Sequence, residues 1–419
     1  MIALLLVGSL ILYVALGVPI AFSIVLAGAT GVILGDVSSL AAIPMQMYGG
    51  VNSFTLMAIP MFALMGEIMG QTSLGTKFIN IASELVGWIK GGLGMATVVV
   101  CMMFGTISGS AVAAAAALTG ILVPEMEKRN YPRELSVSVM SSASTLAIII
   151  PPSSILILYG VAAGVSIADL YLAAIIPGVF CGACLMVVAY IFARKLNLPV
   201  ENKFSLKRLG KALLEGWSAL MIPVVIFGGI FGGICTPTEA AAISVIVALL
   251  GGIREIKLKM IPKMLMRTAM STAIITFMVA GSASLVTIMT LSKAPQTITA
   301  FITSITDNKY LILFFLNILL FGLGCILHGN AIIMLVIPLA LPVMKYLGVD
   351  PIHFGLLMCL GVGIGQQTPP VASVLLTTCA IANVTIPKVW VYLKWFLFAS
   401  IFSWFVITYV PWLSLCIVG

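Results

Sequence analysis

One broken apolar run decides how this chain is organised: Ser141-Ser-Ala-Ser-Thr-Leu-Ala-Ile-Ile-Ile-Pro-Pro-Ser-Ser154. The adjacent prolines Pro151 and Pro152 remove two backbone N–H donors and leave carbonyl groups of the preceding turn without helical partners. Hydroxyl-bearing side chains lie on both sides of the prolines. The stretch therefore predicts two short helices that meet at an unwound, polar segment.

The composition places these broken helices in a membrane. Hydrophobic residues make up 61% of the 419 positions and charged residues only 8%, against about 25% in globular proteins. Because a bilayer span needs about 20 apolar residues, this length allows roughly a dozen crossings and leaves no room for a soluble domain. The net charge of +8 resides in short loops rather than in a basic stripe, so the expected partner is the lipid bilayer and not nucleic acid.

The prolines also indicate an internal repeat. A shift of 218 positions places four prolines of the first half on four of the second, each beside a comparable break: Pro19 on Pro237, Pro124 on Pro342, Pro151 on Pro369 and Pro152 on Pro370. Such self-similarity is typical of two related structural units. We therefore expect a first repeat over residues 1–200 and a second over residues 217–419, joined by a basic cytoplasmic linker at 201–216.

Loop charges predict the orientation of the repeats. By the positive-inside rule, Lys90 before the segment 91–126 and Lys128 and Arg133 after it place both ends of this segment in the cytoplasm. The segment is therefore predicted to be a re-entrant helical hairpin that enters from the cytoplasm. Its counterpart, residues 310–344, has flanks poor in positive charge and should enter from the outer, non-cytoplasmic side.

Opposite entry of repeated units is the inverted-topology arrangement of secondary transporters, whose binding sites lie near the bilayer midplane where the repeats meet. This arrangement places both termini on the outer side of the membrane, which the resemblance described below makes the periplasmic side.

Three segments are predicted to be amphipathic helices at the membrane surface. In residues 72–90, Phe78 and Leu85 share an apolar face, and charged residues lie on the opposite face. Residues 203–215 and 257–267 have a similar pattern. Such helices would brace a static scaffold around a moving part.

Four breaks fall at the predicted membrane depth. Besides 141–154, they are the glycine- and hydroxyl-rich tip at 105–110, the segment 324–330, and the second proline pair within 363–370. Non-helical chain at this depth must be buried in protein or line a polar cavity. Because free carbonyls with nearby hydroxyls can replace the water of a hard monovalent cation, we predict sodium sites at the breaks of both halves.

Each proline pair is followed by a new half-helix. The positive end of its dipole would point toward the centre of the membrane, where it attracts a carboxylate. A small organic anion is the cargo that this arrangement indicates.

Acids within a membrane segment are functional suspects by default. Thr236-Pro-Thr-Glu239 nevertheless has the form of a capping box with proline at the first helical position, so we favour a structural role for Glu239 over a proton relay. Glu67 is interpreted in the same way. His328 has two interpretations, a group that titrates near neutral pH or a satisfied hydrogen-bonding side chain.

The sequence argues against an enzyme. It contains no Gly-x-x-x-x-Gly-Lys-Ser/Thr loop, no His-Glu-x-x-His motif and no paired aspartates of the kind that hold magnesium. A membrane-embedded lipid enzyme should carry convergent acids or histidines at one depth, and the sequence offers no such set. The hydroxyl-rich breaks argue against a purely structural subunit, which has no need for them.

Several motifs, taken together in order and spacing, resemble the large membrane subunit of tripartite ATP-independent periplasmic (TRAP) transporters of the dicarboxylate type. They extend over nearly the whole chain: Ser53-Phe-Thr-Leu-Met-Ala-Ile-Pro60, Phe104-Gly-Thr-Ile-Ser-Gly-Ser-Ala-Val112, Ile150-Pro-Pro-Ser153, Thr236-Pro-Thr-Glu-Ala-Ala-Ala242, Gly348-Val-Asp-Pro-Ile-His-Phe-Gly355 and Thr368-Pro-Pro-Val371. The resemblance implies an all-α polytopic membrane protein with inverted-topology repeats, two re-entrant hairpins and an elevator-type architecture.

The resemblance also implies a function. A sodium-coupled importer in a bacterial inner membrane would receive a small organic acid from a periplasmic substrate-binding protein and pair with a small four-helix membrane subunit, with Na+ as the coupling ion. The family pattern assigns one sodium site to Ser108, Ser110, Ser144 and Thr145, a second to Gly324, Gly365 and Thr368, and the substrate vicinity to Ser153, Asn330 and Gln367.

The chain departs from the family pattern at three positions. The family often has an acid where Ala114 and His328 stand, and a glycine where Ala372 stands. Two alternatives within transport are a stand-alone divalent-anion symporter coupled to sodium and a proton-coupled variant of the same fold.

Overall fold

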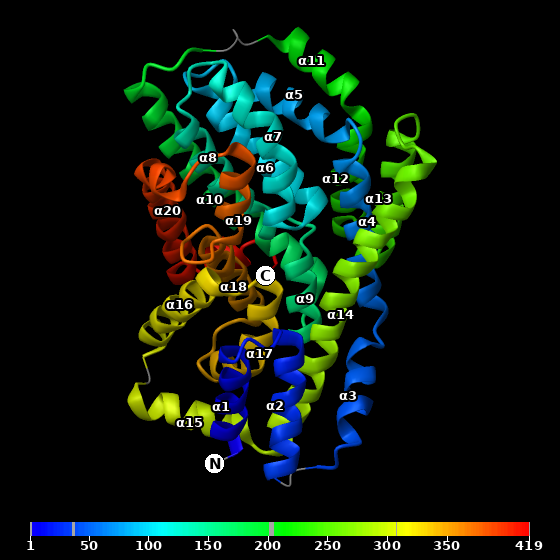
Figure 1. Ribbon diagram of the computed structural model, residues 1–419, viewed down its shortest axis with the longest axis vertical. Helices are drawn as coiled ribbons and strands as arrows, with labels where there is room; N and C mark the ends of the chain where they lie inside the picture. Colours follow the sequence, from blue (N-terminus) through cyan, green and yellow to red (C-terminus); the bar gives the residue numbers. More distant parts are fainter. Residues whose placement is uncertain (1, 36–37, 201–204, 307, 419) are drawn as a thin grey trace.

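The computed structural model describes residues 2–35, 38–200, 205–306 and 308–418, and these residues form helices and no strand. Figure 1 shows the helices arranged along one long axis, with the N-terminus at one end of it. The α-helices have these bounds: α1 (Ile2–Ala15), α2 (Ile20–Gly35), α3 (Ala42–Val51), α4 (Ala58–Gly70), α5 (Leu74–Val86), α6 (Gly92–Ser108), α7 (Ala111–Glu127), α8 (Arg133–Ser144), α9 (Ser154–Ala163), α10 (Ile167–Lys195), α11 (Leu206–Glu215), α12 (Trp217–Phe231), α13 (Pro237–Gly252), α14 (Ile261–Leu291), α15 (Ala294–Ile305), α16 (Lys309–Ile326), α17 (Gly329–Tyr346), α18 (Pro351–Gln366), α19 (Ser373–Ala382), α20 (Ile386–Tyr409) and α21 (Trp412–Leu415). Short 3-10 turns, η1 (Phe54–Met57), η2 (Thr145–Ile148) and η3 (Leu258–Met260), precede or follow α4, α8 and α14.

The 218-residue register of the prolines extends to the helices. Moved by 218 residues, α6 would cover 310–326, and α16 runs from Lys309 to Ile326; α7 would cover 329–345, and α17 runs from Gly329 to Tyr346. The same shift relates α5 to α15, and in Figure 1 these two helices lie at opposite ends of the molecule. This equivalent pair of helices therefore lies at opposite ends of the long axis.

The helices pack in two groups, each with members from both halves of the chain. One group contains α1–α4 and α12–α15: α2, α3, α4 and α15 contact the 31-residue α14, α1 packs on α2, and α13 packs on α4 and α12; we call it the α14 group. The other contains α6–α10 and α16–α20, with the 29-residue α10 and α20 side by side, and we call it the α10 group. The helix α17 of the α10 group also packs against α14. The two groups thus meet along α4, α14 and α15 on one side and α6, α9 and α17 on the other.

Close packing inside the α10 group depends on glycine. A Cβ atom added to Gly361 of α18 would collide with the indole of Trp404, whose Nε1 donates a hydrogen bond to the carbonyl of Leu357 at 3.0 Å. Trp404 is almost fully buried. Helix α18 can approach α20 this closely because Gly361 presents no side chain.

Five described segments are long and apolar enough to cross a bilayer, namely α10, η3 with α14, α16, α17 and α20, and up to seven if each sharply bent helix pair is one span. The remaining apolar helices have 10–17 residues. This differs from the dozen full crossings that length alone suggested, because the breaks divide apolar runs into half-length helices that must meet another half-helix to complete a span.

The amphipathic segments have three different outcomes. The apolar face of α5 packs on protein, where Phe78 is fully buried, although Leu85 is 41% exposed. Helix α11 has no buried residue, and it occupies most of the predicted linker 201–216, of which 201–204 lie outside the described residues. The separate helix expected at 257–267 is wrong: η3 leads into α14, because Pro262 suits a helix start and no breaker follows Arg267.

Candidate functional site

In the first half, the tip between α6 and α7 contacts the break that carries the first proline pair. Gly109 lies in the left-handed region (φ +54°), and a Cβ atom at this position would lie 2.9 Å from the backbone nitrogen of Ser154. The Ser154 hydroxyl donates a hydrogen bond to the Gly109 carbonyl at 3.1 Å. The two non-helical segments of this half therefore support each other.

The second half repeats this meeting with different atoms. Helix α16 ends at Ile326 and α17 begins at Gly329, and the Val371 N–H donates to the Cys325 carbonyl at 3.0 Å. A Cβ atom on Gly324 would lie 2.9 Å from the Cα atom of Gly365. The hairpin break and the second proline break are thus joined by direct backbone contact.

The residues predicted for the first sodium site lie in two places. Ser144 and Thr145 are buried at the end of α8, where their hydroxyls donate to the carbonyls of Met140 and Ser142, both at 2.7 Å. Ser110 is the N-cap of α7, and its Oγ accepts a hydrogen bond from the Ala113 N–H at 3.4 Å. Hydroxyl oxygens that donate to a carbonyl keep lone pairs for a cation.

Ser108, also predicted for the first site, ends α6, and its side chain lies outside the part of the chain that the structure describes.

The residues predicted for the second sodium site lie together. Gly324 and Gly365 are in contact, and the Thr368 N–H donates to the Gly365 carbonyl at 2.9 Å. The Thr368 hydroxyl donates to the Ile364 carbonyl at 2.9 Å, so its own oxygen still has accepting capacity. This set is rich in backbone oxygen and poor in side-chain oxygen.

Several buried polar atoms beside the breaks have no hydrogen-bond partner among the described residues. They are the hydroxyls of Ser141, Ser142 and Ser153 and the side-chain oxygens of Asn330 and Gln367. Because an unpaired buried oxygen is costly, each of these atoms needs a partner, which a water molecule, an ion or a ligand can supply. Three of them, Ser153, Asn330 and Gln367, are those predicted for the substrate vicinity; Ser141 and Ser142 were absent from the predicted site, although their hydroxyl-rich run was noted.

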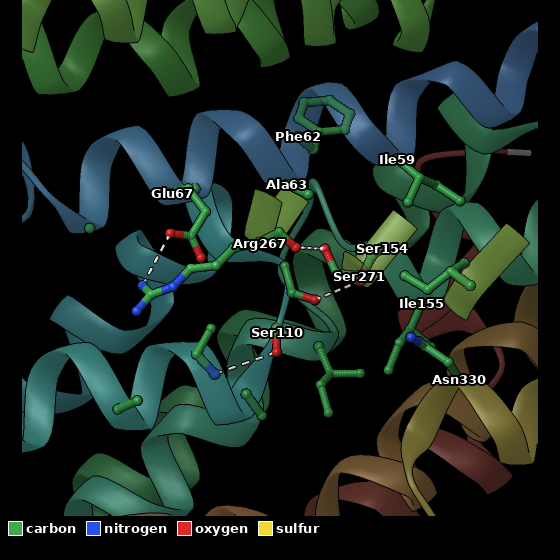
Figure 2. Close-up of a pocket in the computed structure, with 18 of the residues that line it drawn as sticks. Ile59, Phe62, Ala63, Glu67, Ser110, Ser154, Ile155, Arg267, Ser271 and Asn330 are labelled. Carbon is green, nitrogen blue, oxygen red and sulfur yellow. Dashed lines mark hydrogen bonds and ion pairs between the residues drawn. The ribbon is translucent and has the colours of Figure 1, made fainter. Parts of the chain in front are cut away.

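A cavity of about 710 Å³ lies between the two packing groups, lined by α4 and α14 on one side and by α6, α7, α9, α17 and α18 on the other. Figure 2 shows Ser110, Ser154 and Asn330 among its labelled lining residues. His328 and Gln366 line it as well. Of the predicted residues that the structure describes, Ser110 and Asn330 belong to this lining.

The cavity also contains an ion pair that the sequence analysis missed. Arg267 Nη1 of α14 lies 3.4 Å from Glu67 Oε2 of α4, and Figure 2 shows the two side chains together. Glu67 lies in the last turn of its helix, so it does not cap a helix start as Glu239 does; it pairs with Arg267 instead. Arg267 had been assigned to a basic surface segment, yet the signal was present: it is the last cation before an unbroken apolar helix.

The capping box at Glu239 is confirmed. The Thr236 hydroxyl accepts from the Glu239 N–H at 3.3 Å, and Glu239 Oε2 accepts from the Thr236 N–H at 2.8 Å. Pro237 is the first residue of α13. Glu239 therefore holds the start of its own helix.

The fold and the cavity define the class: an all-helical, multi-pass membrane transport protein with broken helices at a central site. The family model for the DctM component of the tripartite ATP-independent periplasmic transporter matches residues 7–413. The chain belongs to this TRAP transporter large-permease family, whose members are transporter subunits and not enzymes.

Relatives cover most of the chain. A putative TRAP transporter large permease of Haemophilus influenzae is 36% identical, over 86% of this chain and 86% of the relative. The C4-dicarboxylate TRAP large permease of Pseudomonas aeruginosa is 33% identical (94% and 93% covered), and the sialic acid TRAP large permease of Vibrio cholerae is 33% identical (90% and 90% covered). The Alcanivorax borkumensis YdaH transporter has the same fold, with a TM-score of 0.63 at 15% identity over 87% of both chains.

Proposed function

We propose that this chain is the transport subunit of a tripartite importer that uses a sodium gradient to bring a small organic carboxylate across a bacterial inner membrane. The observation that carries the proposal is the cavity between the two packing groups, bordered by two chain breaks with unpaired buried oxygens. The relatives named for C4-dicarboxylate, sialic acid and 2,3-diketo-L-gulonate are all named for acids.

Sodium is the proposed coupling ion at both sets of breaks. Ser108, Ser110, Ser144 and Thr145 would supply hydroxyl and carbonyl oxygens in the first half, and Gly324, Gly365 and Thr368 would supply mainly carbonyl oxygens in the second. Non-helical chain in this position is what coordinates Na+ in transporters built from repeats. The orphaned oxygens of Ser141 and Ser153 add further acceptors beside the first set.

Transport would follow from movement of the α10 group against the α14 group. The α6–α7 and α16–α17 pairs would be the re-entrant hairpins, entering from opposite sides of the membrane. The cavity reaches Gln71 and Arg267, close to the basic segments that the positive-inside rule assigns to the cytoplasm. The described arrangement is therefore proposed to be open toward the cytoplasm.

The proposed partners are a periplasmic substrate-binding protein, which delivers the acid, and a small four-helix membrane subunit. The family description is tripartite, which supports both. In this arrangement both termini of the chain lie on the periplasmic side.

Uptake into proteoliposomes tests the proposal. The chain is reconstituted with its small subunit, and radiolabelled succinate or N-acetylneuraminate is added with the binding protein, under an inward Na+ gradient or with K+ in its place. Sodium-dependent uptake is expected, and uptake that continues undiminished in K+ would reject the coupling. Uptake without the binding protein would favour the stand-alone symporter, and uptake driven by a pH gradient alone would favour the proton-coupled variant, with His328 in the cavity as the first residue to substitute.

A further inference from the structure

The wall of the cavity carries one pair of opposite charges. Among the described lining residues, Glu67 and Arg267 are the only ones with a full charge at neutral pH, and apolar side chains form most of the remaining wall. A carboxylate that enters such a site needs a cation, because burial of an unpaired charge away from water is costly. Arg267 is the cation that the cavity provides.

The contact between the two side chains is weak for an arginine and a carboxylate. Arg267 Nη1 reaches a single Glu67 oxygen at 3.4 Å, whereas bidentate pairs form two parallel bonds at about 2.7–2.9 Å. The guanidinium has five N–H donors, and this bond uses one of them. The Arg267 side chain is 49% exposed and that of Glu67 28%, so the guanidinium is accessible to a second partner.

We propose that Arg267 binds the carboxylate of the cargo and that Glu67 is the counter-ion displaced when cargo arrives. The inference rests on the proposed function, since it assumes an anionic cargo in this cavity. Glu67 neutralises the arginine in the empty site, and the cargo replaces a long single bond with a two-pronged one. Glu67 therefore acts as an internal competitor that weakens cargo binding.

The ion pair and the polar residues opposite it belong to different packing groups. Arg267 and Glu67 belong to α14 and α4 of the α14 group, whereas Ser110 and Asn330 line the same cavity from α7 and α17 of the α10 group. Cargo bound to Arg267 and to either of these side chains would bridge the two groups. Movement of the α10 group away from α14 would break the arginine contact and lower the affinity for cargo.

Binding measurements on single variants separate this role from a structural one. The full chain with its small subunit is titrated with succinate and with N-acetylneuraminate, with thermal stabilisation as the readout. Arg267→Met should weaken binding at least about tenfold, because a charge-assisted bidentate bond is lost. Glu67→Gln should tighten binding about threefold or more, because the competing carboxylate is gone.

The opposite changes in cargo affinity expected for Arg267→Met and Glu67→Gln distinguish a binding role from a purely structural one. An ion pair that only holds α4 to α14 would give the same sign for both variants, because either substitution removes the same bond. The matched control is the ion pair Arg133–Glu127, at 2.8 Å and similarly half-exposed, outside the cavity lining; Arg133→Met and Glu127→Gln should leave affinity unchanged.

A second comparison covers the case in which Arg267→Met does not fold. Arg267→Lys keeps the charge but lacks the planar fork, so it should bind several-fold more weakly and should discriminate less between succinate and its mono-amide succinamate. Equal affinity of wild type and Arg267→Lys, loss of affinity in Glu67→Gln, or no stabilisation of wild type by either acid would overturn the inference. Sodium-independent uptake of an acid that does bind would overturn the proposed coupling alone.

Discussion

The two hairpin breaks of this protein occupy equivalent positions and are built from different chemistry. In the first half a side chain makes the junction, from the Ser154 hydroxyl to the Gly109 carbonyl; in the second half backbone meets backbone, at Val371 with Cys325 and at Gly324 with Gly365. Position 154 corresponds to 372 under the 218-residue shift, where the chain has Ala372 and no hydroxyl. The repeat therefore preserves where the helices break and not which atoms are presented there.

Because backbone meets backbone at the second break, we expect it to tolerate an added side-chain atom less well than the first break does. Gly365→Ala should destabilise the protein by about 3 kcal/mol, because its Cβ would press on the Gly324 backbone, which cannot move aside as a flexible side chain can. Gly322→Ala, two residues before Gly324 in α16 and with nothing within 4 Å of the added atom, is the control and should be neutral or slightly stabilising. Melting of the purified protein measures both, and equal effects would mean that the helices do not touch at Gly365.

The sodium response should depend on the break in which a hydroxyl is removed. Ser108→Ala should raise the Na+ concentration for half-maximal uptake about tenfold, and Thr368→Ala only about threefold, since backbone carbonyls dominate the second set and remain in place. Thr377→Ala, whose hydroxyl donates within α19 to Ser373, is the control. Wild-type sodium dependence in both site variants would show that the sites lie elsewhere.

Glycine at the two equivalent positions 154 and 372 should have opposite effects. Ala372 has φ +43°, a left-handed conformation that costs an alanine about 1–2 kcal/mol, so Ala372→Gly should stabilise by up to about 1 kcal/mol after loss of a buried methyl group. Ser154→Gly should destabilise by about 1–2 kcal/mol, through the lost hydrogen bond to Gly109 and a weaker start of α9. Thermal melting decides, and destabilisation of equal size in both variants would contradict the comparison.

The smallest expected effect concerns the start of α5, whose equivalent in the other half is α15. Glu255 accepts hydrogen bonds from the Ser73 hydroxyl and the Ser73 N–H, both at 2.5 Å, whereas no side-chain cap is formed at Lys293, the N-cap residue of α15. The Ser73 hydroxyl, followed by its N–H, lowers the pKa of the Glu255 carboxyl.

A carboxyl with a lowered pKa stabilises the fold at pH values above its ordinary pKa, and this stabilisation is lost as pH falls through the lowered value. Because Glu255 is exposed to solvent, the contribution should be below about 1 kcal/mol. Stability should therefore fall between neutral and acid pH slightly less in Glu255→Gln than in wild type, and Ser73→Ala should reproduce this. Identical pH profiles of all three proteins would mean that the contact does not hold α5.

Much of the site was predictable because its elements are local. The proline pairs, the glycine-rich tip at 105–110 and the capping box at Thr236 act on the backbone within a few residues, so their positions follow from sequence spacing. The segment 257–267 was predicted to be a separate surface helix, but it leads into the long helix α14. Its amphipathic pattern indicates which side of a helix is apolar and does not indicate where the helix ends. The ion pair of Glu67 and Arg267 was not predicted, because each residue taken alone fits an ordinary structural or surface role.

By itself the sequence determined the membrane location of this protein, the positions of its helix breaks and the register of its two halves. Hydropathy is a property of the local sequence, and proline and glycine change the backbone within a few residues. Only the tertiary structure decided which breaks touch, that two packing groups share a cavity, and that residues 200 positions apart form its ion pair. Those contacts join residues that are far apart in the sequence. They depend on how the helices pack against one another, which local sequence patterns do not determine.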